Sequence, residues 1–438
     1  MKVLITGGAG FLGGHVVRAA VQAGHEVRAL VRPAALRDLP PGVRPLAGDL
    51  NDRGCVRQAV RDVEGIIFSA GRNWRPGLPP AAYQAQNVGI VQTFFAALAE
   101  VNPSARVVFT SSMSAVAGSL APLVFTEETG RQGVCLPRLN PYDRAKVECE
   151  RLAHEAATRG SNIVILNPGF MLGPGASPET PLTTPLLIQW FCLRKNPVYV
   201  RTGGHSYCDV RDVAAAHVAA LDKGARGGQY FVGGENLDAV QFQRLLAGQT
   251  GVPCPRRVRA WLPSTAMTVL DFLAAGSFGL WKNPVHRTFA RSLPLYYWGD
   301  SSRAERDLGY RSRPAAWTVR DTIGDLVRRG ELPDEFRFVE AMTDADRPAL
   351  LLLRQLADRH LHRLHLMPRL AAILAAARHN QELGGALDRL LAVGRYDPDR
   401  GRYVLRGQGL TAAAHKLRGL LDYVYYASKN FHRKVSSP

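Results

Sequence analysis

The chain has 438 residues, of which 46% are apolar and 21% are charged, so it is too apolar for a disordered protein and too long for one small domain. Its formal net charge is +18, but 47 of its 55 basic residues are arginine and they are spread through the chain, so no nucleic-acid partner is predicted. No uncharged apolar run reaches the roughly 18 residues of a spanning helix, and the start lacks the features of a signal peptide, so we expect a cytoplasmic protein.

The first half of the chain alternates short apolar strands with helical stretches. Strands are predicted at residues 2–6, 27–31, 65–69, 106–110 and 162–166. Helices are predicted between them at residues 11–24, 53–62, 83–101 and 141–159. Buried strands separated by helices are typical of a parallel sheet covered on both faces. We therefore predict an α/β fold, a Rossmann-like doubly wound parallel sheet.

The composition divides the whole chain into two predicted domains. Residues 1–330 form the first, with the Rossmann core at about 1–170 and a smaller substrate-binding region at about 171–330. Within that region, residues 261–281 are mostly apolar and are interpreted as a core helix or a substrate lid, with a helix lying in a membrane interface as the alternative. Residues 331–438 form an appended helical module of unknown role, with long helices predicted at 348–377 and 410–431 and a turn-rich segment at 395–409.

A glycine-rich turn joins the first predicted strand to the first helix, with the sequence Thr6-Gly7-Gly8-Ala9-Gly10-Phe11-Leu12-Gly13. Gly7 and Gly10 let the backbone turn sharply and approach a pyrophosphate, and Gly13 permits tight packing of the helix on the strand. The N-terminus of the helix then faces the negative charge of the phosphates. We therefore predict a dinucleotide site lined by Gly7, Gly10, Phe11, Leu12 and Gly13.

The residue after the second strand bears on the choice of dinucleotide. An acidic residue at this position would bind the free 2′-hydroxyl of NAD, whereas this chain has Arg32. A guanidinium group forks onto phosphate oxygens, so Arg32 favours NADP(H). NAD(H) is the alternative if Arg32 is only a surface arginine.

Tyr142 and Lys146 form a Tyr-x-x-x-Lys pair at the start of a predicted helix. Residues four apart share a helix face, so the phenol and the ammonium group point the same way. A free tyrosine titrates near ~10 and is a poor base at neutral pH. An adjacent ammonium and a positively charged nicotinamide both stabilise the phenolate, which can then exchange a proton with an alcohol or a carbonyl as hydride moves.

Together these motifs resemble the extended short-chain dehydrogenase/reductase superfamily, which includes NAD-dependent epimerases and dehydratases. The resemblance rests on the Gly-x-x-Gly-x-x-Gly spacing, on Gly48-Asp49-Leu50, and on a Tyr-x-x-x-Lys pair about thirty residues after Ser111-Ser112. It continues through Asn167-Pro168-Gly169 to Leu308-Gly309-Tyr310 and covers about residues 1–328.

The resemblance implies a catalytic role for three residues. Ser112 would polarise the substrate carbonyl, with Ser114 as its rival for that role. Tyr142 would be the acid/base, and Lys146 would tune Tyr142 and hold the ribose hydroxyls of the cofactor.

The resemblance also implies further contacts with the cofactor and two structural roles. Asn87 would bridge helix and sheet, and Asp212 is interpreted as a helix N-cap. Asn167 stands where the family more usually has arginine beside the nicotinamide, so the contact of that arginine is not expected of this chain. The remaining cofactor contacts that the resemblance implies are Asp49, Leu50, Ala70 and Pro168.

Three features favour a branch similar to 3β-hydroxysteroid dehydrogenase and dihydroflavonol reductase. Arg32 suggests an exchangeable NADP rather than a retained NAD. The apolar stretch at 261–281, followed by Asn283-Pro284-Val285-His286-Arg287, resembles the C-terminal region of the steroid enzymes. The side chains predicted to face the substrate are apolar or aromatic, namely Trp74, Met113, Phe170, Met171 and Trp190.

The predicted function is therefore an NAD(P)-dependent oxidoreductase that interconverts a ketone and a secondary alcohol on an apolar small molecule of sterol, polyketide or flavonoid type. A nucleotide-sugar epimerase or dehydratase with tightly bound NAD is the first alternative. A non-catalytic dinucleotide sensor is the second, and the presence of Ser112, Tyr142 and Lys146 together counts against it. A homodimer and peripheral membrane contact remain open.

No metal site is predicted. The six cysteines are scattered without a Cys-x-x-Cys pair, which argues against a zinc site or a disulfide framework. The histidines of the tail lack a His-Glu-x-x-His pattern and are interpreted as solvated or partly buried side chains. They are His360, His362, His365 and His379.

Overall fold

The fold is known from a computed structural model. It describes residues 1–39, 42–73, 80–130, 134–178, 180, 182, 184–195, 198–250, 252, 254–259, 261–262, 265, 291–336, 338–341, 395–397 and 402–404. The chain divides into two compact units. The first comprises Met1–Leu187, Asn196–Gln243 and Pro255–Val319, and the second comprises Ile188–Lys195, Arg244–Cys254 and Arg320–Pro438.

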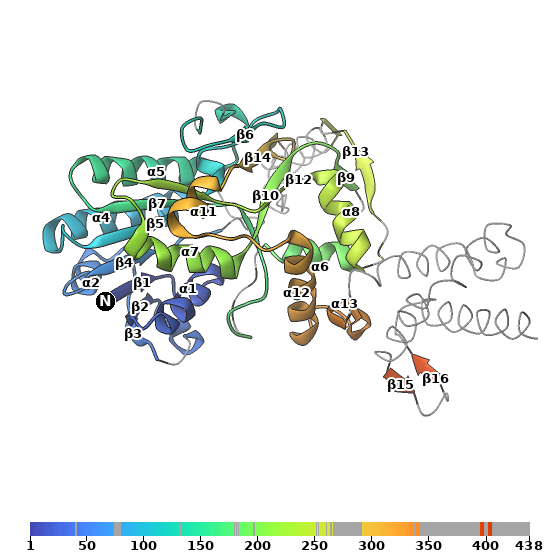
Figure 1. The fold of residues 1–438 in the computed structure, drawn as a ribbon, viewed down its shortest axis with the longest axis horizontal. Coiled ribbons are helices and arrows are strands. Elements are labelled where there is room, and N and C mark those ends of the chain that lie inside the picture. The colour runs from blue at the N-terminus through green and yellow to red at the C-terminus, as the bar shows by residue number, and fades with distance from the viewer. Residues whose placement is uncertain are drawn as a thin grey trace, which may run out of the picture. The chain divides into compact units, whose positions relative to one another are not determined.

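A seven-stranded parallel sheet forms the centre of the first unit (Figure 1). Its spatial order is β3-β2-β1-β4-β5-β7-β11, so the order reverses between β1 and β4. This arrangement confirms the predicted doubly wound sheet, and such a reversal opens a crevice at the carboxyl ends of the strands. The strands are β1 (Lys2–Thr6), β2 (Glu26–Val31), β3 (Arg44–Ala47), β4 (Gly65–Phe68), β5 (Arg106–Thr110), β7 (Ile163–Pro168) and β11 (Gln229–Val232).

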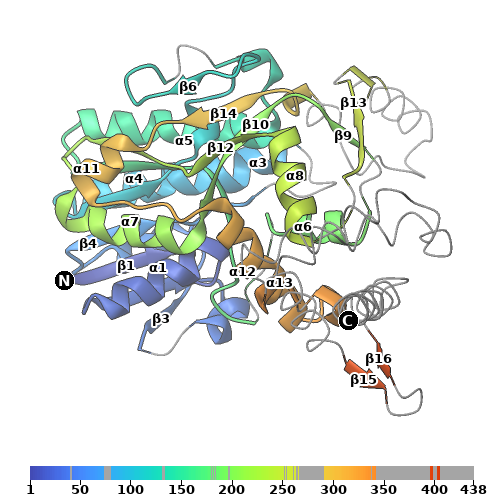
Figure 2. The same ribbon diagram turned by 45° about the vertical axis from the view of Figure 1, so that its right-hand side comes forward.

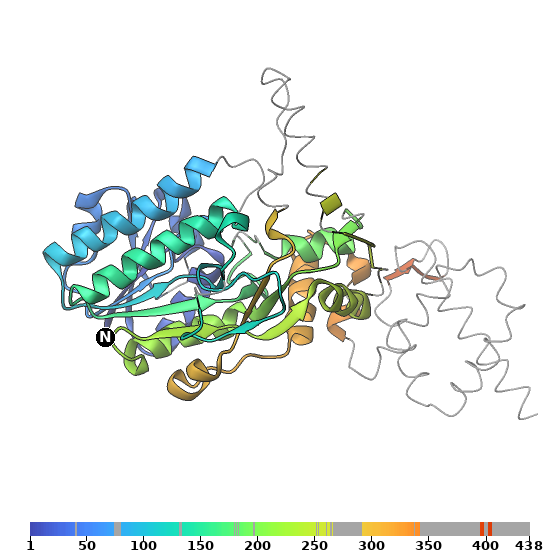
Figure 3. The ribbon, with the colours of Figure 1, turned by 90° about the horizontal axis from the view of Figure 1, so that it is seen from above.

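Helices cover both faces of this sheet, and the layers are separated in the view of Figure 3. On one face lie α1 (Phe11–Gln22) and α7 (Val210–Lys223), which pack on each other. On the other face lie α2 (Arg53–Ala59), α4 (Ile90–Val101) and α5 (Pro141–Thr158). Alternate residues of a strand face opposite sides. Accordingly, Val3 and Ile5 of β1 join the cluster under α1, and Leu4 joins the cluster under α4.

The helix predicted at 83–101 is interrupted by a wider turn. It begins at α3 (Pro80–Tyr83), passes through a π-helical turn at Gln84–Gly89 and continues as α4. Asn87 is buried in the π-helical turn, where its Oδ1 accepts from the backbone N–H of Arg72 at 2.8 Å and its Nδ2 donates to the Arg72 carbonyl at 3.2 Å. These bonds tie the helix to the segment after β4, as the sequence predicted for Asn87.

A second, smaller sheet lies in the same unit (Figure 2). Its order is β12 (Glu235–Asp238), β10 (Gly204–Asp209), β14 (Tyr296–Gly299) and β6 (Val124–Phe125), and β8 (Phe170–Leu172) also pairs with β10. A separate parallel pair is formed by β9 (Val198–Val200) and β13 (Arg256–Val258).

The N-cap of α7 differs from the prediction. Strand β10 runs through to Asp209, and the helix begins directly after it. Asp209 is therefore the N-cap, and its Oδ1 accepts from the backbone N–H of Arg211 at 2.9 Å. Asp212, the predicted cap, lies in the first turn and pairs with Arg313 at 2.6 Å. The prediction was wrong because the strand extends as far as the helix, without a loop between them.

The second unit contains most of α12 (Ala315–Arg328), together with α13 (Phe338–Ala341) and parts of α6 (Leu186–Cys192) and α8 (Ala239–Thr250). The segment predicted to be turn-rich, 395–409, contains the antiparallel pair β15 (Arg395–Asp397) and β16 (Arg402–Val404). The predicted helices at 348–377 and 410–431, the histidines at 360–379 and nearly all of 261–281 lie outside the described residues. Among the residues that are described, no helix is both long and apolar enough to cross a membrane.

The aromatic cluster under α4 gives a test of the core. The ring of Phe94 is fully buried, with its centroid 4.6 Å from that of Phe68. Phe94→Ala should lower the free energy of unfolding by about 3–5 kcal/mol, because a large buried ring is replaced by a cavity. Denaturant unfolding measures this effect. The exposed Leu123 is the control, and Leu123→Ala should change the value by less than about 0.5 kcal/mol. Equal losses would contradict this packing.

Candidate active site

The glycine-rich turn closes tightly on itself between β1 and α1. Gly7 has a φ of +73°, and its carbonyl accepts the N–H of Gly10 at 2.9 Å. A Cβ on Gly13 would lie 2.0 Å from the Gly7 oxygen, and a Cβ on Gly7 would lie 2.9 Å from the Cα of Ala70. Side chains at these two positions would therefore collide with backbone. Gly7 and Gly13 are therefore needed for the turn to close, in agreement with the tight turn predicted for a dinucleotide site.

The start of α1 fits a phosphate group. Gly10 is the N-cap residue and provides no side-chain cap, so the first amides of the helix are not capped by a side chain from that position. The side chains of Phe11 and Leu12 are buried in the core. The predicted contacts of these two residues with the cofactor would therefore be made by their backbone N–H groups. An uncapped helix N-terminus behind a glycine turn favours negative charge through aligned N–H groups and the helix dipole.

Other predicted cofactor residues follow the neighbouring strands at the same edge of the sheet. Arg32 comes directly after β2 and is exposed. Asp49 follows β3 and accepts from the backbone and side-chain amides of Asn51, each at 2.9 Å. Ala70 follows β4, and its N–H donates to the hydroxyl of Thr6 at 3.3 Å. Of the remaining two, Leu50 is half-buried and packs beside the core. Pro168 is buried and is the last residue of β7.

The predicted catalytic residues meet at the start of α5. The helix is capped by Asn140, whose Oδ1 accepts from the backbone N–H of Asp143 at 3.0 Å. The next turn presents Tyr142 and Lys146, both half-buried. A hydrogen bond joins the hydroxyls of Tyr142 and Ser112, and the Lys146 ammonium donates to the Thr110 carbonyl at 3.3 Å. The structure therefore brings Ser112, Tyr142 and Lys146 together.

Burial controls the charge states of this group. It raises the pKa of the Tyr142 phenol, the neighbouring Asp143 carboxylate raises it further, and the hydrogen bond with Ser112 opposes both. Burial also lowers the pKa of Lys146, against the attraction of Cys149 and Glu150. Tyr142 is therefore held as a neutral phenol in the protein alone, ready to donate a proton.

Asn167 has a different role from the family arginine at that position. Its Nδ2 donates to the Ser112 carbonyl at 2.9 Å and to Oε2 of Glu150 at 2.6 Å. Glu150 is buried and also accepts from the Ser111 hydroxyl and from Gln229. Asn167 therefore connects the serine segment to a buried carboxylate on α5.

The residues predicted to contact the substrate lie in different parts of the structure. Phe170 packs on His205 with ring centroids 4.9 Å apart, whereas Met171, the next residue on β8, packs on the core cluster beside α1. Met113 is only 2% exposed and packs in a cluster with Phe231. The contact of Met113 with substrate stays a prediction, and its side chain is buried in the protein alone. Trp190 lies on α6 in the second unit, and Trp74 lies outside the described residues.

Three residues near Tyr142 were not predicted from the sequence. Asp143 is buried and accepts from the Tyr297 hydroxyl at 3.0 Å. The ring of Tyr297 stacks on that of His205 with centroids 5.2 Å apart and planes 4° apart. Asp143 could have been noticed beside Tyr142 as a carboxylate on the inner face of the helix. Tyr297 and His205 come from distant strands and carry no local signal.

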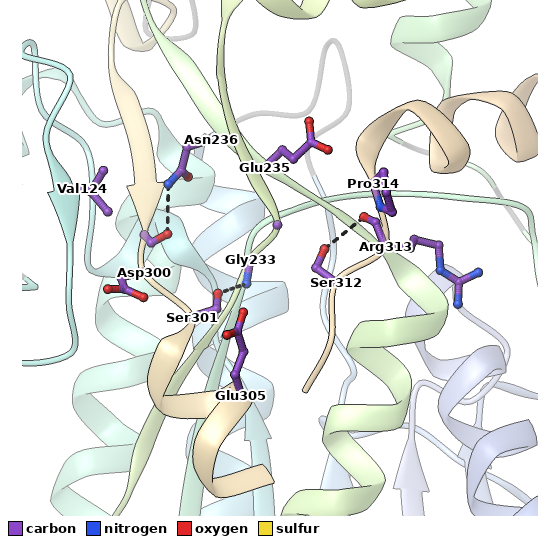
Figure 4. A pocket seen from close by; sticks show the side chains of 12 residues that line it. Val124, Gly233, Glu235, Asn236, Asp300, Ser301, Glu305, Ser312, Arg313 and Pro314 are labelled. Carbon is purple, nitrogen blue, oxygen red and sulfur yellow. Dashed lines mark hydrogen bonds between the residues drawn. The ribbon is translucent and has the colours of Figure 1, made fainter. Parts of the chain in front are cut away.

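A polar pocket of about 410 Å³ lies between β12, β14 and α11 (Ser302–Leu308) (Figure 4). Its polar groups bond largely to one another. The backbone N–H of Gly233 donates to Ser301 at 2.9 Å, and Asn236 donates to the Gly299 carbonyl at 3.2 Å. None of its lining residues belongs to the predicted catalytic or cofactor set.

Comparison with known proteins assigns the chain to a family. The model of the NAD dependent epimerase/dehydratase family matches residues 3–233, from β1 to the end of β11. The chain belongs to the NAD-dependent epimerase/dehydratase family. The resemblance to the extended short-chain dehydrogenases/reductases is thereby confirmed, and the protein is an NAD(P)-dependent enzyme of that type.

Relatives in this family include reductases. A putative dihydroflavonol 4-reductase of Synechocystis sp. is 32% identical over 334 residues, which are 74% of this chain and 92% of the relative. Sterol demethylase protein B of Methylococcus capsulatus is 31% identical over 348 residues, 75% of this chain and 99% of the relative. These two agree with the predicted branch of the family, and they support oxidoreductase activity.

Solved structures show the same fold. The crystal structure of gox2253 matches with a TM-score of 0.65 at 26% identity, over 76% of this chain and 99% of that one. MoeE5 in complex with UDP-glucuronic acid and NAD matches with a TM-score of 0.54 at 24% identity, over 75% and 99% of the two chains. The second likeness is evidence for the fold alone.

The glycine turn gives a direct test of cofactor binding. Gly13→Ala should weaken NADPH and NADH binding at least about tenfold, because the new Cβ must push the Gly7 carbonyl and so distort the turn. Fluorescence titration of the reduced nucleotides measures the affinity. Gly248→Ala is the control, since a Cβ on Gly248 meets nothing within 4 Å. An unchanged affinity in Gly13→Ala would show that the turn does not hold the dinucleotide.

Proposed function

We propose that this protein is an NADP(H)-dependent reductase or dehydrogenase that interconverts a ketone and a secondary alcohol on an apolar small molecule. The observation that carries the proposal is the hydrogen-bonded pair of Ser112 and Tyr142 with Lys146 one turn further along the same helix. A hydroxyl pair beside an ammonium is suited to hold one substrate oxygen and to exchange a single proton with it.

The roles of the three residues follow from their positions. A bound nicotinamide would supply or accept the hydride. Ser112 holds the carbonyl oxygen by a hydrogen bond, and Tyr142 donates its proton to that oxygen as negative charge develops there. Lys146 lies on the same side of α5 and stabilises the resulting phenolate. In the oxidative direction the same phenolate takes the proton of the alcohol.

The apolar substrate is supported by the side chains around the site. Phe170 and His205 are half-buried aromatic residues in ring contact, and the Tyr297 ring continues the stack. Burial lowers the pKa of His205 to about 4, so its ring is neutral at physiological pH. Aromatic faces without charge suit an apolar or ring-containing substrate better than a nucleoside diphosphate, which needs fixed cationic donors. Names such as dihydroflavonol 4-reductase among the relatives agree with this substrate class.

The catalytic assignment predicts the effect of one hydroxyl. Tyr142→Phe should reduce turnover about 10²–10⁴-fold, because the proton donor is lost while the ring remains. NADPH affinity should stay nearly unchanged, since the ring still fills its place. Steady-state rates and nucleotide titration measure the two effects. Full activity in this variant would remove Tyr142 from the mechanism.

The cofactor preference rests on Arg32, which is exposed at the carboxyl end of β2. Arg32→Asp should shift the NADPH-to-NADH affinity ratio at least about tenfold toward NADH, because the 2′-phosphate loses its cation and the 2′-hydroxyl gains an acceptor. Arg44→Asp is the matched control, since Arg44 is also exposed but begins β3 at the opposite end of the strands. Equal ratios in both variants would mean that Arg32 does not contact the phosphate.

The first experiment on the wild-type protein is the identification of its bound nucleotide. The protein is denatured, the released nucleotides are separated, and the emptied protein is titrated with NADPH and NADH. Little retained nucleotide and a preference for NADPH are expected of a reductase with an exchangeable cofactor. Stoichiometric NAD would instead indicate an epimerase or dehydratase that recycles its hydride internally.

A further inference from the structure

Asp143, the residue after Tyr142, is a buried carboxylate surrounded by neutral groups. It is 4% exposed. Its Oδ2 accepts from Asn140 Nδ2 at 2.6 Å and from the Tyr297 hydroxyl at 3.0 Å. Its carboxyl also bonds with the Ser114 hydroxyl. The described part of the chain gives it no lysine or arginine partner. A buried carboxylate without a cation is costly, so its presence beside an acid/base residue suggests a role.

Ser114 connects Asp143 to the predicted catalytic serine. The hydroxyl oxygens of Ser114 and Ser112 are 3.1 Å apart, and the backbone N–H of Ser114 donates to Ser112 Oγ at 3.2 Å. Ser112 in turn bonds with the Tyr142 hydroxyl. The order of hydrogen bonds is therefore Asp143, Ser114, Ser112 and Tyr142.

The direction of these bonds depends on the proton of Asp143. Each hydroxyl has one proton to donate, and an ionised carboxylate can only accept. When Asp143 is ionised, it accepts a hydrogen bond from the Ser114 hydroxyl, and the Ser114 oxygen then accepts a hydrogen bond from the Ser112 hydroxyl. When Asp143 is protonated, its carboxyl group has a proton of its own to donate to Ser114, while Oδ2 can still accept from Tyr297 and Asn140. Ser114 then donates to Ser112, whose own proton is free to point toward Tyr142 and a substrate oxygen.

We propose that Asp143 is a positioning residue that, through Ser114, determines whether Ser112 presents its proton to the substrate oxygen. The proposal rests on the proposed role of Ser112. The protonated form of Asp143 prepares Ser112 to donate to a carbonyl, and the ionised form turns the Ser112 proton away. Asp143 acts through Ser114 and is therefore a positioning residue and not a catalytic one.

The charges around Asp143 allow this change near neutral pH. Burial raises the pKa of Asp143 to about 7, and the bonds from Tyr297, Ser114 and Asn140 oppose the rise. The titratable groups that face it are Tyr142 from its own helix and Tyr297 from β14. Burial raises the pKa of both phenols, so they stay neutral in this range. His205, which stacks on Tyr297, is neutral there as well.

The test follows the ring of Tyr142 in the full chain, with no substrate and no turnover. Tyrosine labelled with ¹³C at the ζ carbon reports the hydrogen bonding of each phenol by NMR, and Tyr142→Phe identifies the Tyr142 signal. In the wild type this signal should shift between pH 5 and pH 9 with a midpoint near 7. Asp143→Asn should give a flat titration, since an amide can donate to Ser114 at every pH.

Asp143 could act on the Tyr142 signal through the hydrogen bonds of Ser114 and Ser112, a relay, or directly through its charge. Two further variants separate these effects. Ser114→Ala should at least halve the amplitude of the Tyr142 shift, because only the through-space effect of Asp143 remains. Tyr297→Phe removes one donor to Asp143 but leaves the relay, so the amplitude should be kept and the midpoint should rise. An undiminished amplitude in Ser114→Ala, or a titration that persists in Asp143→Asn, would overturn the proposal.

Unfolding measurements give a second readout that does not involve Ser112. An unfolded aspartate titrates near ~3.9, and the native Asp143 near 7. The native state therefore holds the extra proton between these values, and stability should fall as pH rises from about 4 to about 7. Asp143→Asn should remove this part of the slope. An identical slope in wild type and variant would show that Asp143 does not titrate as a buried group.

Reduction of 1-tetralone by NADPH separates this inference from the proposed function. In the wild type, kcat/KM should fall above about pH 7, and Asp143→Asn should lack this limb. A wild-type protein that fails to reduce any apolar ketone speaks against the proposed function, whereas the NMR titration still decides the role of Asp143. A wild-type enzyme with the same limb in Asp143→Asn would overturn the inference alone.

Discussion

Parallel pairing of β1 with both β2 and β4 places the carboxyl ends of the strands at one edge of the sheet, and every part of the site depends on this constraint. The glycine turn follows β1, Arg32 follows β2, and Ser112 follows β5 after one intervening residue. Thr6, the last residue of β1, helps to hold the edge together, since its carbonyl accepts from the Ser69 hydroxyl at 2.7 Å. Residues that are far apart in the sequence are thereby brought to the same edge of the sheet, at the carboxyl ends of the strands.

Helix α5 combines chemistry and support in one element. Tyr142 and Lys146 supply the predicted acid/base pair, while the buried carboxylates of Asp143 and Glu150 hold the serine segment from two directions. Glu150 acts through Ser111 and Asn167, and Asp143 acts through Ser114. Burying two carboxylates costs folding free energy, which is offset only if their hydrogen bonds are made. The same bonds restrict the positions that the serine hydroxyl can take.

The fold alone does not decide between the activities found in this family. The chain is similar in sequence to a reductase-named relative, and its fold is similar to that of a structure in complex with a sugar nucleotide. The difference between such enzymes resides in side chains around the crevice. In this chain the relevant features are a cation after β2 and a stack of uncharged aromatic rings on the second sheet.

The sequence by itself determined the alternation of strands and helices, the glycine turn and the Tyr-x-x-x-Lys pair, because each is a local pattern of spacing. The strands at 2–6 and 106–110 were predicted with their observed limits. Only the tertiary structure decided that Asp209 caps α7, that Met113 belongs to the core, and that the helix before Val101 contains a π-helical turn. These features depend on how far a strand extends and on which side of a segment neighbouring elements pack. The contact of Tyr297 on β14 with Asp143 on α5 joins residues 154 positions apart, and no local spacing can encode a contact between a strand and a helix so distant in the chain.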